Sequence, residues 1–254
     1  MPTTHAADFE VKLATTDEDL RAAQRLRYQV FVRELGAQGH FVDHDAELEK
    51  DPFDVHADHL LLRDRQKDEI VGVYRVLRQA AANAAGGFYS ASEYDLNVLE
   101  SSGRRLLELG RSCIHPEYRN GLAMHRLWTA LAQYIRDFEI EVLFGVASFH
   151  GTNATQFTQP LALLHHRYLA PASLRVTAHA SSFHPMDAIT PAALDHKQAM
   201  VQVPGLIKAY LRLGGFVGHG AYVDHAFNTT DVCLILDTTQ MRPGQAQRYT
   251  ANSQ

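Results

Sequence analysis

The sequence has 254 residues, of which 46% are hydrophobic and 21% charged. This composition is typical of a globular protein and excludes collagen-like, disordered and disulfide-stapled chains. Twenty-four basic against twenty-nine acidic residues give a net charge of −5, which argues against a dedicated nucleic-acid-binding protein. The N-terminus shows no signal peptide, and no apolar run reaches the roughly 20 residues of a membrane span. Two cysteines far apart in the chain form no disulfide framework, so we expect a cytoplasmic protein.

The first half of the chain alternates between strand and helix patterns. Residues 9–13 predict a strand, and Thr15 with Glu18 has the spacing of a capping box for a helix that Gly36 ends near residue 35. Residues 36–58 have no clear period and predict an ordered loop with short helical pieces. Residues 59–63 and 70–78 predict two strands joined by a charged hairpin turn.

Residues 80–103 are rich in Ala, Gly and Ser and predict an irregular segment before a strand over 105–114. A helix over 122–138 and a fully apolar strand over 142–149 follow. The pattern then predicts helix over 153–169 with a kink or restart at Pro160, a short helix after Pro204, and closing strands over 217–223 and 232–236. We expect residues 1–254 to form one α/β domain with a polar tail at about 240–254.

Charged residues interrupt several apolar stretches. Arg27 is either the edge of an apolar helical face or a group turned inward toward a ligand, and its chemistry alone favours the edge. Asp51 and Asp54 lie in a loop, where acids form turns by default. Arg75 shares one strand face with apolar residues and therefore requires a counter-charge.

The stretch LLELGRSC repeats this pattern with Glu108 and Arg111, which form either a structural buried salt bridge or part of a functional site. Gly121 precedes a helix, where it either exposes N–H groups to a phosphate or pantetheine chain or only makes the turn. Cys113 is an acyl-accepting nucleophile or, more in keeping with its apolar strand, core filler. The fifteen histidines contain no HExxH motif, and we expect no metal site.

The order of these elements resembles the GNAT acyltransferase fold, a mixed sheet flanked by helices. The set Arg27-x-x-x-Phe31, Asp51-x-x-Asp54, Arg75 and Glu108-x-x-Arg111 resembles that of acyl-homoserine-lactone synthases, which are GNAT-related and take their acyl group from acyl carrier protein. A narrower resemblance, to L-ornithine N-alpha-acyltransferases, covers most of positions 21–237. It is carried by RLRYQVFVRELGA, DPFDVHADHLLLRD, VGVYRVLR, GGFYSASEYDL, LLELGRSCIHPEYRNG, LFGVASFHGT, PGLIKAYLRLGGFVG and FNTTDVC.

This resemblance implies transfer of a 3-hydroxy fatty acyl chain from acyl carrier protein to the α-amine of ornithine, which gives lyso-ornithine lipid. In the GNAT fold the donor lies beside the splayed fourth and fifth strands, so the backbone N–H groups of Ser112 and Cys113 are candidates for the oxyanion site. Glu108 is the candidate to accept the amine proton, and its competing role is ion-pair partner of Arg75 or Arg111.

The same resemblance implies a substrate-binding set around the acceptor. Arg27, Arg75 and Arg111 would hold its carboxylate beside Phe31, whereas Asp51 and Asp54 would neutralise its side-chain ammonium.

The donor loop departs from the superfamily pattern, because Tyr118 stands where a coenzyme A loop has Gln or Arg. This departure fits a donor presented as the phosphopantetheine thioester of acyl carrier protein, with no bound cofactor. Arg119, Gly121, Ala123 and Arg126 are the expected carrier and pantetheine contacts, with Arg136 as a further docking charge.

Two alternatives remain at this point. The same chemistry could act on glutamine, on another amino acid or on S-adenosylmethionine, as in lactone synthesis. The chain could instead be a non-catalytic acyl-carrier or lipid-binding module, a reading that loss of the charged set would favour. Lipidic substrates imply peripheral contact with the inner face of the cytoplasmic membrane, although the sequence shows no amphipathic anchor.

Overall fold

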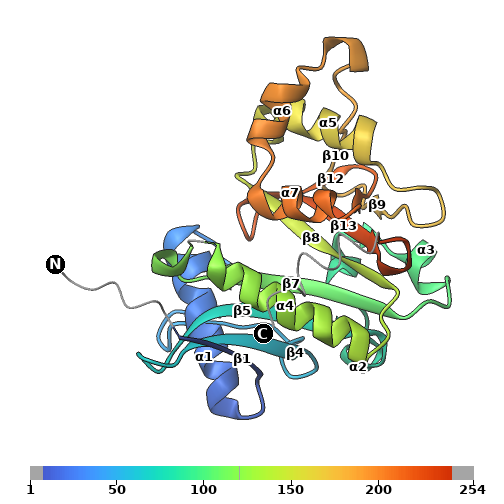
Figure 1. The fold of residues 1–254 in the computed structure, drawn as a ribbon. Helices are drawn as coiled ribbons and strands as arrows, with labels where there is room; N and C mark the ends of the chain where they lie inside the picture. Colours follow the sequence, from blue (N-terminus) through green and yellow to red (C-terminus); the bar gives the residue numbers. More distant parts are fainter. Residues whose placement is uncertain (1–7, 120, 242–254) are drawn as a thin grey trace.

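A mixed sheet of nine strands forms the centre of the protein in the computed structural model, which describes residues 8–119 and 121–241 (Figure 1). The strand order is β1–β4–β5–β7–β8–β13–β12–β10, with β11 also paired to β13. Only β7 and β8 run parallel; the other described neighbours are antiparallel. The strands are β1 (Phe9–Leu13), β4 (Asp58–Asp64), β5 (Glu69–Arg78), β7 (Leu106–Ile114), β8 (Val142–His150), β10 (Phe183–His184), β11 (Phe216–Val217), β12 (Ala221–Asp224) and β13 (Thr229–Asp237). The predicted α/β fold with a mixed sheet is confirmed.

Helices cover both faces of the N-terminal half of the sheet. Along β4, Leu60 and Leu62 pack in the same core cluster as α4 (Leu122–Asp137), whereas Leu61 packs with α1 (Asp17–Arg27). This alternation follows from the two-residue period of a strand, which turns successive side chains to opposite faces. The helix of α1 continues as a wider π-helix over Tyr28–Glu34 and ends before Gly36, as predicted.

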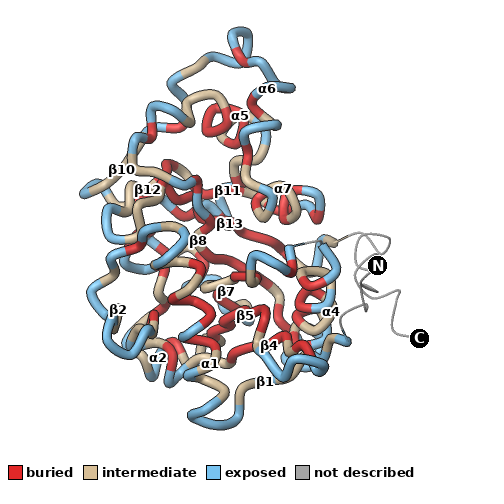
Figure 2. The backbone as a smooth tube through the Cα atoms, turned by 90° about the vertical axis from the view of Figure 1, so that its left-hand side faces the viewer, coloured by how far each residue is buried: buried red, intermediate tan, exposed pale blue. Residues whose placement is uncertain are grey.

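The C-terminal half adds a helical layer above β8 and β13, where the strands are buried along most of their length (Figure 2). It contains α5 (Thr158–Tyr168), α6 (His196–Gln202) and α7 (Gly205–Arg212). Pro160 lies in the first turn of α5 after a short 3₁₀ turn, so the helix restarts there, as predicted. The patternless segment 170–200 contributes α6, β10 and a short strand β9 (Thr177–Ala178) that pairs with β6 (Tyr94–Asp95).

Some local predictions were wrong. The cap of α1 is Thr16, one residue later than expected, because Thr16 Oγ1 accepts the N–H of Asp19 at 3.1 Å. Residues 36–58 contain no helix. They contain a short hairpin of β2 (Val42–Asp43) and β3 (Leu48–Glu49), and in its turn the N–H of Ala46 donates to Asp43 Oδ1 at 3.0 Å. The excursion over 80–103 contains α2 (Gln79–Ala85) and α3 (Asn97–Glu100) besides β6. The predicted tail lies outside the described residues from 242 onward.

Strands β7 and β8 separate near the middle of the sheet. Only Leu106–Glu108 of β7 pair with β8, where their partners are Val142–Phe144. Just beyond this pairing, a Cβ added at Gly145 would lie 2.1 Å from the carbonyl oxygen of Leu109. The register of β7 against β5 shifts at Arg111, whose φ of 50° is left-handed and marks a β-bulge. A close contact followed by a bulge therefore opens the sheet beside Gly110 and Ser112.

Candidate active site

A cavity of about 260 Å³ lies where β7 and β8 part. Among the residues predicted from sequence, those that line this cavity are Phe31, Arg75, Glu108, Arg111 and Ser112. The opposite wall comes from β8, β12 and β13 and includes acidic side chains. The predicted residues that do not line it are Arg27, Asp51, Asp54, Cys113, Arg119, Gly121, Ala123, Arg126 and Arg136.

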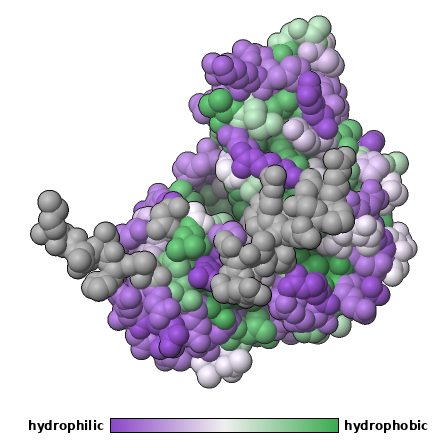
Figure 3. Space-filling view, viewed as in Figure 1, coloured by the Kyte–Doolittle hydropathy of each residue, from purple (hydrophilic) through white to green (hydrophobic). Residues whose placement is uncertain are grey.

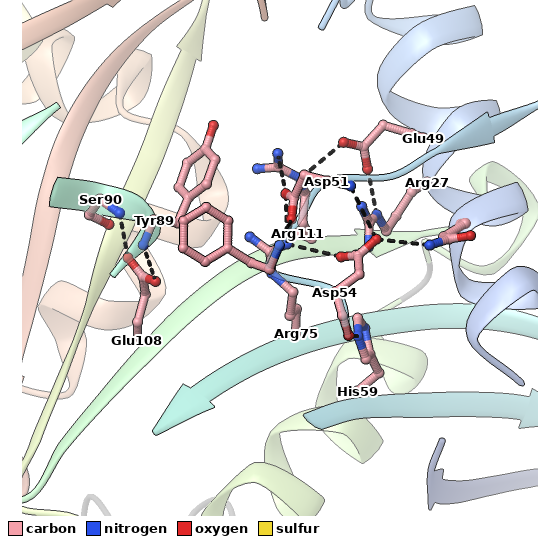
Figure 4. Close-up of polar contacts among 12 residues, drawn as sticks. Arg27, Glu49, Asp51, Asp54, His59, Arg75, Tyr89, Ser90, Glu108 and Arg111 are labelled. Carbon is pink, nitrogen blue, oxygen red and sulfur yellow. Dashed lines mark hydrogen bonds and ion pairs between the residues drawn. The ribbon is translucent and has the colours of Figure 1, made fainter. Parts of the chain in front are cut away.

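Three arginines and three carboxylates form a closed ring of alternating charge beside the cavity (Figure 4). Arg27 pairs with Glu49 and Asp54, at 2.7 Å to Asp54. Arg75 pairs with Asp51 at 2.6 Å and Asp54 at 2.9 Å. Arg111 completes the ring through Glu49 at 3.2 Å and Asp51 at 2.9 Å. All members are buried or nearly so, and their charges cancel within the ring.

This ring corrects two expectations for the acceptor. Arg27 is fully buried and is neither an edge residue nor a contact of the cavity. Asp51 and Asp54 neutralise arginines of the ring, which leaves them unsuited to neutralise a ligand's ammonium. Glu49 was not predicted, because it ends the short strand β3 in a stretch whose sequence has no periodic pattern, two residues before Asp51.

The ring is held strongly in its charged form. Burial raises the pKa of Asp54, but the charges of Arg27 and Arg75 outweigh burial and keep that pKa well below its usual range. Arg111 is further held between two aromatic rings, with its guanidinium carbon 4.6 Å from the ring centroids of both Tyr89 and Phe227. The predicted counter-charge for Arg75 is thus confirmed, and its partners come from the loop that precedes β4.

Glu108 stands apart from the ring. Its two carboxylate oxygens accept the backbone N–H groups of Tyr89 at 2.8 Å and Ser90 at 2.6 Å (Figure 4). Burial raises its pKa, although the two hydrogen bonds oppose this effect. Because Arg75 and Arg111 use the ring carboxylates as partners, the competing role of Glu108 as their ion-pair partner is not supported. A buried carboxylate with a raised pKa on the cavity wall has the properties of a proton acceptor.

The backbone of β7 distinguishes Ser112 from Cys113. The N–H of His115 donates to Val71 on β5 at 2.9 Å. Because successive N–H groups of a strand point to opposite sides, the N–H of Cys113 also faces β5, and that of Ser112 faces the side from which β8 has departed. Burial raises the pKa of the Cys113 thiol to about 12, as expected for a core residue. This orientation favours Ser112 over Cys113, and the oxyanion role of both N–H groups stays a prediction.

Three further carboxylates line the cavity and were not predicted. One oxygen each from Glu93, Asp224 and Asp231 lies within 4.8 Å of the others. Burial and the neighbouring carboxylates raise the pKa values of Glu93 and Asp231. Asp231 directly precedes the apolar run of β13 and does not interrupt it, unlike Glu108 in β7. Glu93 follows a short 3₁₀ turn and Asp224 ends β12, and neither interrupts an apolar run.

The expected donor loop is partly engaged within the chain. Arg119 forms a bidentate ion pair with Glu34 at 2.6 and 2.7 Å. Gly121 has a φ of 91°, which favours glycine at the start of α4. Ala123 is buried in the core, whereas Arg126 is exposed. The roles of these residues toward a donor stay predictions.

The sequence of this chain matches a known class of transferase. Residues 26–129 match the family described as an acetyltransferase (GNAT) domain, and the chain is an acyltransferase. It is 53% identical to L-ornithine N(alpha)-acyltransferase of Rhodobacter capsulatus over 95% of both chains, and 40% identical to that of Brucella abortus over 96% of this chain and 90% of the relative. The chain therefore belongs to the L-ornithine N(alpha)-acyltransferase family.

Among solved structures, the chain is similar to BjaI, a CoA-dependent acyl-homoserine lactone synthase, with a TM-score of 0.53 and 14% identity. The match covers 96% of this chain and 89% of the other, and supports the fold. Among the helices of residues 8–119 and 121–241, none has the length and hydrophobicity needed to cross a membrane.

Proposed function

We propose that this protein transfers a 3-hydroxy fatty acyl group from acyl carrier protein to the α-amine of L-ornithine and so makes lyso-ornithine lipid. The observation that carries the proposal is the cavity between β7 and β8, because Glu108 and Ser112 line it from a single strand. The names of the curated relatives support ornithine as the acceptor.

The reaction needs a neutral amine and a stabilised oxyanion. Glu108 accepts a proton from the α-amine as nitrogen attacks the thioester carbon, and the Ser112 N–H donates to the oxygen that becomes negative. When the carbon–sulfur bond breaks, the proton held by Glu108 goes to the leaving thiolate. An amide and a free thiol result, so the proton balance closes without an outside acid.

Arg75 offers a site for the α-carboxylate of the acceptor. Its ion pairs within the described residues all use Nη1. The Nε and Nη2 atoms lie 4.0 and 3.8 Å from the Cβ position of Gly110, a residue of the cavity wall. These two parallel N–H groups suit a bidentate carboxylate. Binding there would direct the α-amine toward β7, where Glu108 and Ser112 lie.

The environment of Tyr118 supports acyl carrier protein as the acyl donor. This side chain is buried, and its hydroxyl donates to Asp64 at 2.8 Å, so it does not serve a nucleotide diphosphate. A phosphopantetheine thioester on acyl carrier protein lacks that diphosphate. The arginines of the predicted docking set, Arg119, Arg126 and Arg136, are all exposed, and the acidity of a carrier protein would complement them.

The lipid product motivates a further part of the proposal, peripheral contact with the cytoplasmic membrane surface. In the view of Figure 3, hydrophobic residues form separate patches among hydrophilic ones. Contact would therefore be weak and reversible. Co-sedimentation with anionic vesicles, with and without bound acyl carrier protein, tests this part, and identical recovery in the supernatant with and without vesicles would contradict it.

The central experiment is a mass-spectrometric assay of the purified protein. It offers 3-hydroxyacyl carrier protein or the matching acyl-coenzyme A as donor, and ornithine, glutamine, lysine and S-adenosylmethionine in competition as acceptors. A carrier-dependent acyl-ornithine product is the expected result. Acyl-glutamine or a lactone would overturn the acceptor, an equal rate with acyl-coenzyme A would overturn the donor, and no product from any pair would overturn the proposed function.

A further inference from the structure

The wall of the cavity carries more acidic than basic residues. Arg75 and Arg111 line it, but their charges are balanced by Glu49, Asp51 and Asp54 in the ring behind it. The other acidic residues of the wall are Glu93, Glu108, Asp224 and Asp231. Within the described residues no ion pair joins any of these four to a cation. Buried carboxylates without counter-charge are costly, so a cationic ligand would relieve this cost.

Three of the four, Glu93, Asp224 and Asp231, gather at one end of the cavity and are called the acidic trio here. Asp231 lies on β13, Asp224 ends the neighbouring β12, and Glu93 follows the 3₁₀ turn that holds Glu108. Glu93 and Asp231 are each only 3% exposed, whereas Asp224 is partly exposed. The trio thus forms a pocket with a buried floor and a more open side.

Two buried oxygen atoms of the trio lack a protein partner. Among the described residues, Glu93 Oε2 and Asp231 Oδ1 accept no hydrogen bond. The other Asp231 oxygen accepts from Thr229 Oγ1 at 3.1 Å, and the Ser148 side chain also lies against this carboxyl group and lowers its pKa. Asp224 Oδ1 accepts the N–H groups of Ala226 and Phe227. Unsatisfied buried acceptors on a cavity wall indicate a missing donor, since such atoms are otherwise paired. The unpaired oxygen atoms are therefore evidence for a ligand that is independent of the clustering of the three acids.

We propose that the acidic trio binds the side-chain ammonium of a dibasic amino-acid acceptor. An ammonium group carries three N–H donors, and the trio offers one carboxylate oxygen toward each. This assignment rests on the proposed function and names the part of the site that reads the acceptor's side chain. With the α-carboxylate on Arg75 and the α-amine at Glu108, the trio selects for a distal positive charge. Glutamine, which carries none, would leave the trio unpaired.

The test compares L-ornithine with L-norvaline, which has the same carbon chain and lacks the distal amine. The variants are Glu93→Gln and Asp231→Asn, and Glu100→Gln on α3 is the control because Glu100 is exposed and outside the cavity wall. We expect the wild type and the control to prefer ornithine by kcat/KM about 100-fold or more, because a site built for a donor rejects an analogue that lacks it. In either trio variant this ratio should fall at least about tenfold, mainly through the KM for ornithine.

Ornithine binding, measured by calorimetry without an acyl donor, separates the test of the trio assignment from the test of the proposed function. If the wild type acylates ornithine but the trio variants keep the ornithine-to-norvaline ratio, the trio assignment is wrong and the proposed function stands. If no acyl-ornithine forms, the proposed function fails, and ornithine binding that is lost in Glu93→Gln would still support the trio. Calcium or magnesium binding by the EDTA-dialysed wild type, lost in the variants and without ornithine preference, would overturn the assignment in favour of a metal.

A loss of activity in the trio variants can be distinguished from a loss of folding. Replacement of a buried carboxylate by an amide removes like-charge repulsion within the trio, so thermal denaturation should show variants at least as stable as the wild type. A variant that unfolds at lower temperature would contradict the view that the trio is unpaired in the free protein.

Discussion

Arg111 Nη2 and Asp51 Oδ2 lie 2.9 Å apart, and this ion pair closes the ring of six alternating charges. Arg111 comes from the bulge of β7 and Asp51 from the loop before β4, so the contact ties the cavity wall to a segment 60 residues earlier. Because each charge has two opposite neighbours, the ring is neutral and keeps the guanidinium groups of Arg75 and Arg111 fixed beside the cavity. Preorganised donors of this kind lose little entropy when a substrate binds.

Removal of one ring carboxylate should destabilise the protein strongly. Asp54→Asn leaves Arg27 and Arg75 buried with one anionic partner fewer, and a broken buried pair costs about 3–5 kcal/mol. Glu34→Gln, which breaks the half-exposed pair with Arg119, should change the free energy of unfolding by about 1 kcal/mol or less. Urea denaturation of both variants measures the difference, and losses of equal size would show that the ring is not a buried network.

Glu108→Gln should lower turnover by about 10²- to 10⁴-fold, the range for a lost general base. The base acts in its deprotonated form, and its pKa is raised above the ordinary value of 4.5. The wild-type rate should therefore increase with pH through a pKa above that value, and the variant should lose this rising limb. Steady-state kinetics from pH 5 to 8 measure the limb, and thermal denaturation checks that the variant folds. An unchanged pH profile would remove Glu108 from the reaction.

Gly145 is expected to be intolerant of any side chain. A Cβ there would meet the carbonyl oxygen of Leu109 at 2.1 Å, so Gly145→Ala must push β8 away from β7 at the point where they part. Overpacking of this kind costs about 1–3 kcal/mol. Gly205→Ala at the start of α7 is the matched control, since no atom lies within 4 Å of its Cβ position. Chemical denaturation that shows equal stability for both variants would place the divergence of the strands elsewhere.

The acidic trio should make stability depend on pH in the direction opposite to the ring. The folded-state pKa values of Glu93 and Asp231 are raised, so the folded protein binds more protons than the unfolded chain above about pH 4. Their contribution is present at low pH and is lost as pH rises through the raised values. The groups that face the pair are Asp224, Glu108 and Arg111, with Tyr89 beside them.

The measurement for this dependence is the difference in unfolding free energy between the wild type and the double variant Glu93→Gln with Asp231→Asn, followed from pH 4 to 8. The wild type should lose stability relative to the double variant as pH rises, and ornithine should reduce that loss in the wild type alone. A difference that stays constant over this range would show that the two carboxyl groups titrate normally. For the control variant Glu100→Gln, the difference in unfolding free energy from the wild type should not change over this pH range.

The sequence was most informative where a pattern repeats along one element. The long strands and α4 follow from apolar runs, and Arg75 and Glu108 stood out because each interrupts such a run. Asp231 gives no such signal, because it follows two threonines and comes before the apolar run of β13. Resemblance to a family supplied the charged set as a group, but not which members face the ligand.

The remaining parts depend on contacts between distant segments. Glu49 joins the ring only because the β2–β3 hairpin folds against α1 and β7, and residues 36–58 have no period that predicts this hairpin. The trio combines an irregular segment with a strand pair more than 100 residues later in the chain. Because tertiary packing determines such distances, the spacing of residues along the chain does not predict them.

The neutrality of the charged ring has a consequence for how this enzyme can diversify. The ring draws all its members from the first half of the chain and compensates its own charges, while two members of the trio lie on the C-terminal strands β12 and β13. If the trio reads the acceptor as proposed, exchanges of Asp224 or Asp231 would alter which amine is accepted and leave every arginine of the ring paired. The contacts that hold the ring together and the residues proposed to select the acceptor therefore lie on largely separate stretches of the chain.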